Sequence, residues 1–224
     1  MLYSLAPTSS LNKEIQIKTW QLFLFVLLAN LLAAWFYNEH IVTREVYHTL
    51  LAEQMEADRI DEYFNFLKKL SIGGYFFQPF FLWLQITFFV LLIQMPLVLM
   101  FIDIPFHQLF RTLTYASVPM TALAIARILW LYFLEPSEIS LAILSVVPFS
   151  IASFLDASQY PLTAYMVLNK FNLFEMAWCF IIYKGLTSTG KLEKSNAALL
   201  VLCIWTLLLA LQWGITAYLN GVNG

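Results

Sequence analysis

Long apolar stretches recur along this chain, and most of them are long enough to cross a lipid bilayer. A helix needs about 20 residues to cross a hydrocarbon core of about 30 Å. The stretches cover residues 20–37, 76–102, 110–134, 139–155, 171–186 and 197–219. In hydrocarbon every backbone N–H and C=O must be bonded within the protein, and a helix achieves this within one segment. The pattern therefore predicts an all-α, polytopic transmembrane helical bundle.

The overall composition supports a membrane protein. Of the 224 residues, 61% are hydrophobic and 12% are charged, whereas a soluble domain is about 45–50% apolar and about 25% charged. The net charge of -2 and the lack of a basic block argue against nucleic acid as a partner. Cys179 and Cys203 each lie in an apolar stretch, so we expect packing roles and no disulfide.

One polar segment, residues 38–74, interrupts the apolar pattern. Its apolar residues recur at spacings of three and four, which predicts an amphipathic extramembrane helix or helical pair that ends at Gly73-Gly74. Acids outnumber bases in it, whereas helices that bind lipid surfaces are usually rich in Lys and Arg. We expect a cap on the membrane domain or a surface for protein docking. The domain itself is expected at 20–219, after a polar leader (1–19) and before a short tail (220–224).

The number of spans depends on residues 139–155. This stretch is short and contains Pro148, which weakens a helix, so it is either re-entrant, giving five full spans, or a sixth span. With five spans and the N-terminus inside, Lys184, Lys191 and Lys194 lie on the cytoplasmic side, as the positive-inside rule prefers. A six-span arrangement with the N-terminus outside also places the basic residues as the positive-inside rule prefers. We favour five.

Charged residues lie largely at the edges of the apolar stretches, but Arg127 and Glu175 lie farther inside them. A charge at the centre of a membrane helix costs roughly 2.5–3.5 kcal/mol on insertion scales, so it needs a partner, water or a function. In the five-span arrangement the two residues lie at similar depths, and we predict that they form an intramembrane polar pair. The pair is either a structural contact, which we favour, or a site for an ion, a proton or a lipid headgroup.

The sequence contains no recognisable catalytic constellation. It lacks a His-Glu-x-x-His pattern, a glycine-rich phosphate loop, a nucleophile elbow and a Cys-x-x-Cys pair. Its three histidines, His40, His48 and His107, are interpreted as solvated loop residues. We therefore expect a protein that is not an enzyme and that binds no cofactor or metal.

Short motifs in the third and later spans resemble the Yip (Ypt/Rab-interacting protein) domain family. They read Phe110-Arg111-x-Leu113-x-Tyr115-Ala116-x-x-Pro119, then Asn172-Leu173-Phe174, Gly185-Leu186 and Lys194-x-x-Ala197. The order of apolar blocks is similar from about residue 20 to residue 219. The chain departs from the family pattern at Trp178, one position later than expected, and in its unusually polar segment 38–74.

The resemblance implies a roughly five-span protein with a cytoplasmic N-terminus. Because the long N-terminal region of eukaryotic members has no counterpart here, it implies a bacterial-type member in the cytoplasmic (inner) membrane. Eukaryotic members act in vesicle traffic with small GTPases, a role that a shared fold does not transfer. The family-like residues are Tyr115, Ala116, Pro119, Phe174 and Gly185.

Two functions follow as hypotheses. The first is a non-enzymatic scaffold, adaptor or accessory subunit that acts through protein partners in the membrane, with lipids as its other contacts and with room for self-association. The second is a transporter or permease component with Arg127 and Glu175 at its polar site.

Overall fold

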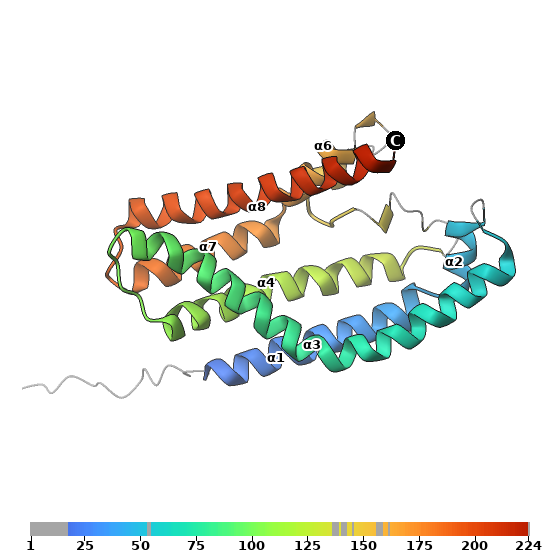
Figure 1. Cartoon of the computed structure of the whole chain (residues 1–224), viewed down its shortest axis with the longest axis horizontal. Coiled ribbons are helices and arrows are strands. Elements are labelled where there is room, and N and C mark those ends of the chain that lie inside the picture. Colours follow the sequence, from blue (N-terminus) through green and yellow to red (C-terminus); the bar gives the residue numbers. More distant parts are fainter. Residues whose placement is uncertain are drawn as a thin grey trace, which may run out of the picture.

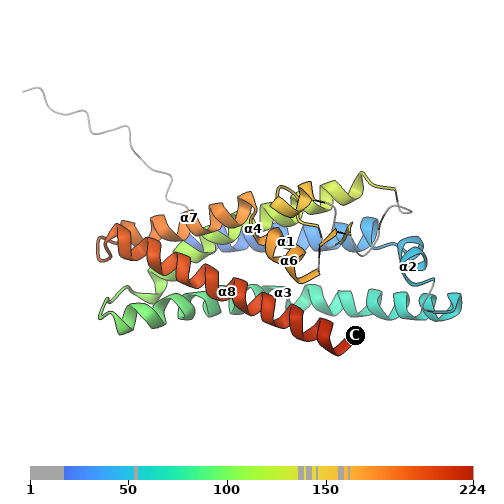
Figure 2. The same cartoon turned by 90° about the horizontal axis from the view of Figure 1, so that it is seen from above.

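A computed structural model describes residues 18–52, 55–135, 139, 143–144, 146–155, 159–160 and 162–223, apart from the side chains of 162 and 219–223. Within these residues the chain is helical, and the sole β-type pairing is an isolated antiparallel bridge between Ser150 and Asn172. The helices run roughly along one long axis (Figures 1 and 2). The predicted all-α class is confirmed.

The elements follow one another in a simple order. They are α1 (Thr19–Phe36), a π-helical turn η1 (Tyr37–Ile41), α2 (Arg44–Leu51), α3 (Ala57–Leu99), α4 (Phe106–Tyr132), a 3₁₀ turn η3 (Ile151–Phe154), α6 (Leu162–Lys170), α7 (Leu173–Ser188) and α8 (Lys194–Asn223). Among the described residues, four helical segments are long and apolar enough to cross a membrane: Thr19–Ile41, Ala57–Leu99, Phe106–Tyr132 and Lys194–Tyr218. These four segments support the prediction of a membrane protein.

Helix α7 is shorter than these four. Its 16 residues extend roughly 24 Å, less than the hydrocarbon core of about 30 Å. It begins part-way along α4 and runs antiparallel to it (Figure 1). The expected span at 171–186 is therefore a helix, but one that starts within the bundle.

The predicted helix break at Gly73-Gly74 is wrong. Helix α3 continues through both glycines and through Pro79 and Pro96. Away from water, the backbone groups of this apolar stretch have no better partner than the helix itself, so glycine and proline are tolerated. Residues 44–72 do form the expected helical pair, but its second helix is also the second membrane segment.

The described part of 139–155 contains no helix that could cross a membrane. It consists of the helical residues 143–144, the short turn η3 and otherwise irregular backbone, while residues 140–142 and 145 lie outside the described ranges. The expected leader at 1–19 also lies almost wholly outside them. At the other end, α8 continues to Asn223 through most of the residues expected to form a tail.

Helix α4 lies at the centre of the bundle, in contact with α1, α3 and α7. The main apolar core joins α3, α4, α7 and α8; among its most buried members are Val90, Ile93, Ala116 and Ile182. A smaller core at one end contains Ile41, Val46, Leu131 and Ile139. The large apolar side chains that remain exposed on α1, α3 and α8 match a lipid-facing surface.

Charges separate towards the two ends of the bundle. One end gathers the start of α1, the end of α3, the start of α4, the end of α7 and the start of α8 (Figure 1, left). We call it the basic end, because it holds Lys18, Arg111, Lys184, Lys191 and Lys194 against Asp103 and Glu193. The opposite end holds α2 and the start of α3, where acids outnumber bases, and we call it the acidic end.

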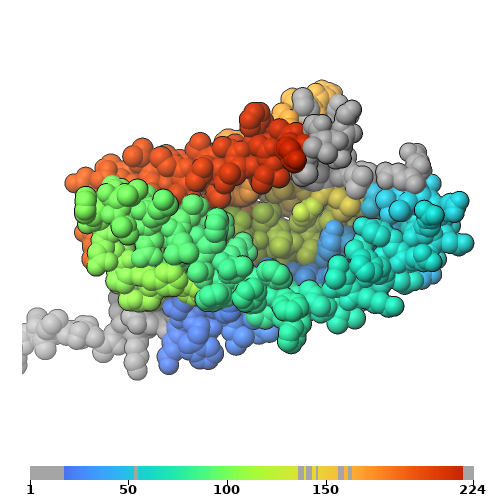
Figure 3. Space-filling model, in the orientation of Figure 1, coloured from blue at the N-terminus to red at the C-terminus, as the bar shows by residue number. Residues whose placement is uncertain are grey.

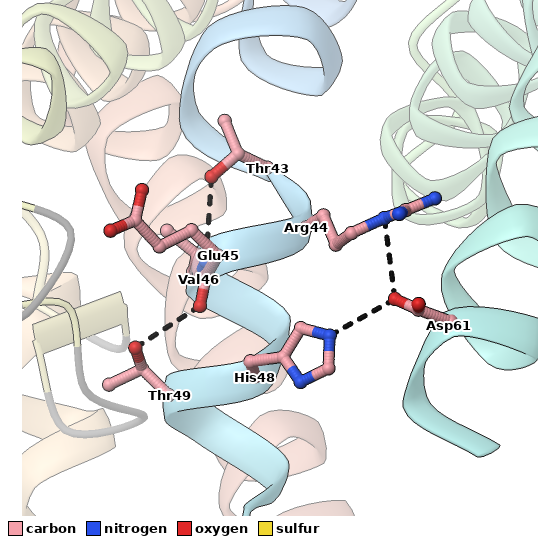
Figure 4. A network of polar contacts seen from close by, with 7 residues as sticks. All are labelled: Thr43, Arg44, Glu45, Val46, His48, Thr49 and Asp61. Atoms are coloured by element: carbon pink, nitrogen blue, oxygen red, sulfur yellow. Dashed lines mark hydrogen bonds and ion pairs between the residues drawn. The ribbon is translucent and has the colours of Figure 1, made fainter. Parts of the chain in front are cut away.

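A polar network docks α2 onto α3 at the acidic end (Figure 4). Asp61 of α3 forms an ion pair with Arg44, with Oδ1 and Nε 3.3 Å apart, and contacts His48 Nε2 at 3.0 Å. The Thr43 hydroxyl caps α2 by accepting from the Val46 amide. Since these side chains are partly exposed, each contact contributes only about 0.2–1 kcal/mol. Val46 of α2 and Ile60 of α3 are both buried.

Candidate intramembrane polar site

The structure does not bring Arg127 and Glu175 together, so the predicted pairing is wrong. Among the described residues, Glu175 forms its ion pair with Lys170, with Nζ and Oε1 2.7 Å apart. Arg127, on α4, donates from Nη2 to the backbone carbonyl of Leu144. Each charged side chain therefore contacts a residue in the segment between α4 and α7, Glu175 through an ion pair and Arg127 through a hydrogen bond.

Arg127 donates to the end of a short helical segment that follows α4 in the chain. Ile143 and Leu144 are helical, but Val146 and Val147 are not, so the Leu144 carbonyl lacks the donor that a continuing helical turn would provide. A carbonyl left unpaired inside a membrane bundle costs several kcal/mol, and a guanidinium is a multiple donor that can satisfy it. The Arg127 Nε is buried and has no hydrogen-bond partner among the described residues.

The start of α7 carries the other charge. Asn172 caps the helix, because its Oδ1 accepts from the Glu175 amide at 2.9 Å. Glu175 in the first turn also lies where the helix dipole favours a negative charge. Lys170, the last residue of α6, lies across this cap from the carboxylate. The two helix ends therefore hold an ion pair that is only 33% exposed at Lys170 and 12% at Glu175.

A buried amide network supports that junction. Asn169 Oδ1 accepts from the Val147 amide at 3.0 Å and the Ser150 hydroxyl at 3.2 Å. Asn172 Nδ2 donates to the Asn169 carbonyl at 2.9 Å. The Ile151 amide adds a backbone bond to Phe171 at 3.1 Å. These contacts fasten η3 to the start of α7 and satisfy polar groups that would otherwise be buried unpaired.

The Lys170–Glu175 pair lines a cavity of about 340 Å³ inside the bundle. Helices α1, α3, α4, α7 and α8 and the end of α6 all contribute to its wall. Its other polar residues are Asn30, Gln85, Ser117 and Thr121. Asn30 Nδ2 donates to Thr121 Oγ1 at 2.8 Å, which joins α1 to α4. Leu82, Phe89 and Trp178 are among its apolar residues.

The molecular surface is hollowed between α3 and α8. These helices lie together at the basic end and diverge towards the acidic end, so that α4 is visible between them (Figure 3). Gln85 of α3 lies midway along the apolar part of that helix and is exposed. It makes no side-chain hydrogen bond within the described part of the chain. An amide in this position would face hydrocarbon unless water, a ligand or a partner covers it.

The lining of the cavity can bind both hydrogen-bond donors and hydrogen-bond acceptors. Its formal charges cancel, because one ammonium lies against one carboxylate, so a guest with a net charge would remain uncompensated in a low-dielectric site. The amides supply donors and acceptors, and the hydroxyls supply both as well. Among the described residues, no group of three or more His, Cys, Asp or Glu side chains is arranged to hold a metal.

The family-like residues all take packing positions. Ala116 is fully buried and Pro119 lies within α4. Phe174 packs edge-on against Phe149, with ring centroids 6.2 Å apart. Gly185 of α7 lies directly against α4. Tyr115 borders a separate groove at the basic end.

No family model, curated protein or solved structure matches this chain.

Lys170 was not predicted as the partner of Glu175. The prediction paired Glu175 with Arg127, because both charges lie well inside apolar stretches. The signal was local: Asn172 lies three residues before Glu175, a spacing typical of a helix N-cap. A helix that starts at residue 173 places Lys170 just before it, within reach of the first turn.

Proposed function

We propose that this chain is a non-enzymatic integral membrane protein that binds a small polar ligand in the cavity around Lys170 and Glu175, as a permease component or a ligand-binding accessory subunit. The observation that carries the proposal is a charge-balanced set of polar side chains in the otherwise apolar wall of a cavity of about 340 Å³. Ligand sites of small molecules occupy about 300–1,000 Å³ and place a few polar groups in mainly apolar walls.

The balance of charge in the lining defines the ligand class. A zwitterion or an uncharged polar molecule could exchange hydrogen bonds with Lys170, Glu175 and Gln85 without leaving a net charge buried. The discontinuity between α6 and α7 supports the same function. Broken helices that expose a helix end inside the bundle are a recurring way to build substrate sites in membrane transporters.

Thiol accessibility tests the proposal. In a background with Cys179→Ala and Cys203→Ala, Ser117→Cys is placed in the cavity wall and treated with a water-soluble maleimide in intact membranes. If the cavity holds water, Ser117→Cys reacts. Glu175→Gln in the same background should change its reaction rate, because the ion pair borders the same space.

Two control positions make the result specific. Phe88→Cys is exposed on α3 and should meet lipid, so the reagent should not label it. Ala116→Cys lies in the apolar core and should also stay unlabelled. An unreactive Ser117→Cys, with a cysteine placed outside the membrane reacting normally, would rule out a water-filled site.

A scaffold function is the second candidate, and the length of α3 favours it. Its 43 residues extend roughly 65 Å, about twice the hydrocarbon core. The part beyond the membrane carries exposed Tyr63 and Phe66 beside acids, a surface suited to a protein partner. Purification in mild detergent should then retain a stoichiometric partner in the native chain and lose it with Tyr63→Ser and Phe66→Ser. A partner kept by that variant would contradict the docking surface.

We further propose a topology of five passes with the N-terminus inside, in a bacterial cytoplasmic membrane. The direction of α7, antiparallel to α4 (Figure 1), supports a fifth pass. The basic end would then face the cytoplasm, in agreement with the positive-inside rule. The resemblance to Yip-domain proteins supports the same topology. Reporter fusions at the loop 189–193 should report a cytoplasmic position, and a periplasmic signal would reverse the orientation.

A further inference from the structure

We infer that the groove between α4 and α7 at the basic end binds the phosphate of an anionic phospholipid. This groove is separate from the intramembrane cavity and has a volume of about 670 Å³. Its polar lining includes Arg111 from α4, Lys184 from α7 and Lys191 from the turn before α8. The site does not depend on the ligand proposed above.

The three cations lack acidic partners. No Asp or Glu lines the groove, and none of the three forms an ion pair with a described residue. Arg111 instead stacks over Tyr115, Lys184 over Phe180, and Lys191 donates to the Asp103 carbonyl. Elsewhere in the described chain, Arg44, Lys68 and Lys170 each contact a carboxylate. The groove therefore concentrates positive charge that the protein itself does not neutralise.

The apolar part of the groove favours a lipid over a free anion. Leu109, Phe180 and Ile181 line it together with the cations. Phe180 is exposed on the outer side of α7, where an acyl chain would lie beside it. Basic pockets between membrane helices near a bilayer surface are suited to phosphate headgroups, because each nearby cation adds about 1 kcal/mol of attraction and the chain stays in the bilayer.

The close contact of the two helices gives the groove a fixed floor. Gly185 lines it and lies against Thr112 of α4, so the helix backbones approach closely at this point. Arg111 precedes Thr112 and Lys184 precedes Gly185 in sequence. The two cations therefore emerge from neighbouring backbone positions on facing helices, and an arginine fork is well suited to a phosphate.

Lipid titration of the delipidated full chain, followed by native mass spectrometry, tests this inference. Phosphatidylglycerol should bind more tightly than phosphatidylcholine. The triple variant Arg111→Gln, Lys184→Gln, Lys191→Gln should weaken phosphatidylglycerol binding on the order of a hundredfold, as expected for three charge contacts. Phosphatidylcholine binding should hardly change.

The acidic end offers a control of identical chemistry. Arg59→Gln, Lys68→Gln, Lys69→Gln removes one arginine and two lysines there and should leave phosphatidylglycerol binding unchanged. An equal loss in both triple variants would mean that net charge alone attracts the lipid, and the site would be rejected. No loss in the basic-end variant would reject it as well.

A competition experiment and a conservative substitution complete the test. Inorganic phosphate at concentrations matching the lipid should not displace phosphatidylglycerol; full displacement would show that the site takes phosphate without an acyl chain and would overturn the lipid assignment. Should the triple variant fail to fold, Arg111→Lys retains the charge but not the guanidinium fork. It should still weaken phosphatidylglycerol binding measurably, and unchanged binding would contradict the role of Arg111.

Discussion

Gly185 of α7 faces Thr112 of α4 at a distance that leaves no room for a side chain. A Cβ atom on Gly185 would lie 2.1 Å from Thr112 Cγ2 and 2.9 Å from Thr112 Cβ. The second distance matters more, because a Cβ cannot rotate away, so a larger residue must push the helices apart. Small residues that permit such close approach are typical of helix contacts in membranes.

Gly185→Ala should therefore destabilise the bundle, although alanine favours a helix. We expect a loss of about 1–3 kcal/mol, the usual cost of overpacking, measured by unfolding in mixed detergent micelles. Adding Thr112→Ala removes the two nearest atoms and should recover part of the loss.

Gly214→Ala on α8 is the matched control. No atom lies within 4 Å of a Cβ at that position, so the substitution should be neutral or stabilising by up to about 1 kcal/mol. If Gly185→Ala behaves like Gly214→Ala, α4 and α7 do not touch at this point.

Double-mutant cycles should separate the two charged contacts of the bundle. Arg127→Leu and Glu175→Leu should have additive effects on the free energy of unfolding, within about 0.5 kcal/mol, because the two residues share no contact. Lys170→Leu with Glu175→Leu should be non-additive, because removal of one partner strands the other charge. A coupled Arg127–Glu175 cycle would restore the pairing predicted from sequence.

Asn172→Ala should loosen the start of α7 from the end of α6. It removes the cap on the Glu175 amide and the bond to the Asn169 carbonyl. A lost cap alone costs about 1 kcal/mol, and a buried carbonyl left unpaired adds about 1–3 kcal/mol. Thr43→Ala, which removes the longer cap bond of 3.4 Å on exposed α2, should cost less in the same unfolding assay. Equal losses would mean that burial adds nothing at Asn172.

Asp61→Asn should loosen α2 from α3 only slightly. The carboxylate holds Arg44 and His48 at the partly exposed acidic end, so we expect a loss of about 0.2–1 kcal/mol that shrinks as salt is added. Hydrogen exchange of the α2 amides measures it. An effect that is independent of salt would point to packing instead of charge.

The membrane segments could be predicted from sequence because a bilayer demands a long apolar helix wherever the chain crosses it. Thr19–Ile41 and Lys194–Tyr218 lie close to the expected ranges. The ends of helices inside the apolar region were harder to predict from sequence. Glycine and proline end helices in water, whereas Gly73-Gly74 and Pro79 lie inside α3, where the backbone has no competing partner.

The polar site could be predicted only in part. The expectation that Glu175 needs a counter-charge was sound, but the choice of Arg127 assumed that intramembrane charges seek each other. Lys170 reaches Glu175 across a single helix cap, and Arg127 donates to the carbonyl of Leu144 near the end of a short helical segment. The need of this carbonyl for a hydrogen-bond donor can be recognised only once the path of the chain after α4 is known.

The continuity of α3 has a mechanical consequence. Asp61, which holds α2, and Gln85, at the mouth of the cavity, lie on the same uninterrupted helix, roughly 36 Å apart at 1.5 Å per residue. Gly73, Gly74 and Pro79 lie between these two residues, and a proline inside a helix removes a backbone hydrogen bond and is the usual cause of a kink. The docking point of α2 and the wall of the cavity are therefore joined through the part of α3 that bends most easily.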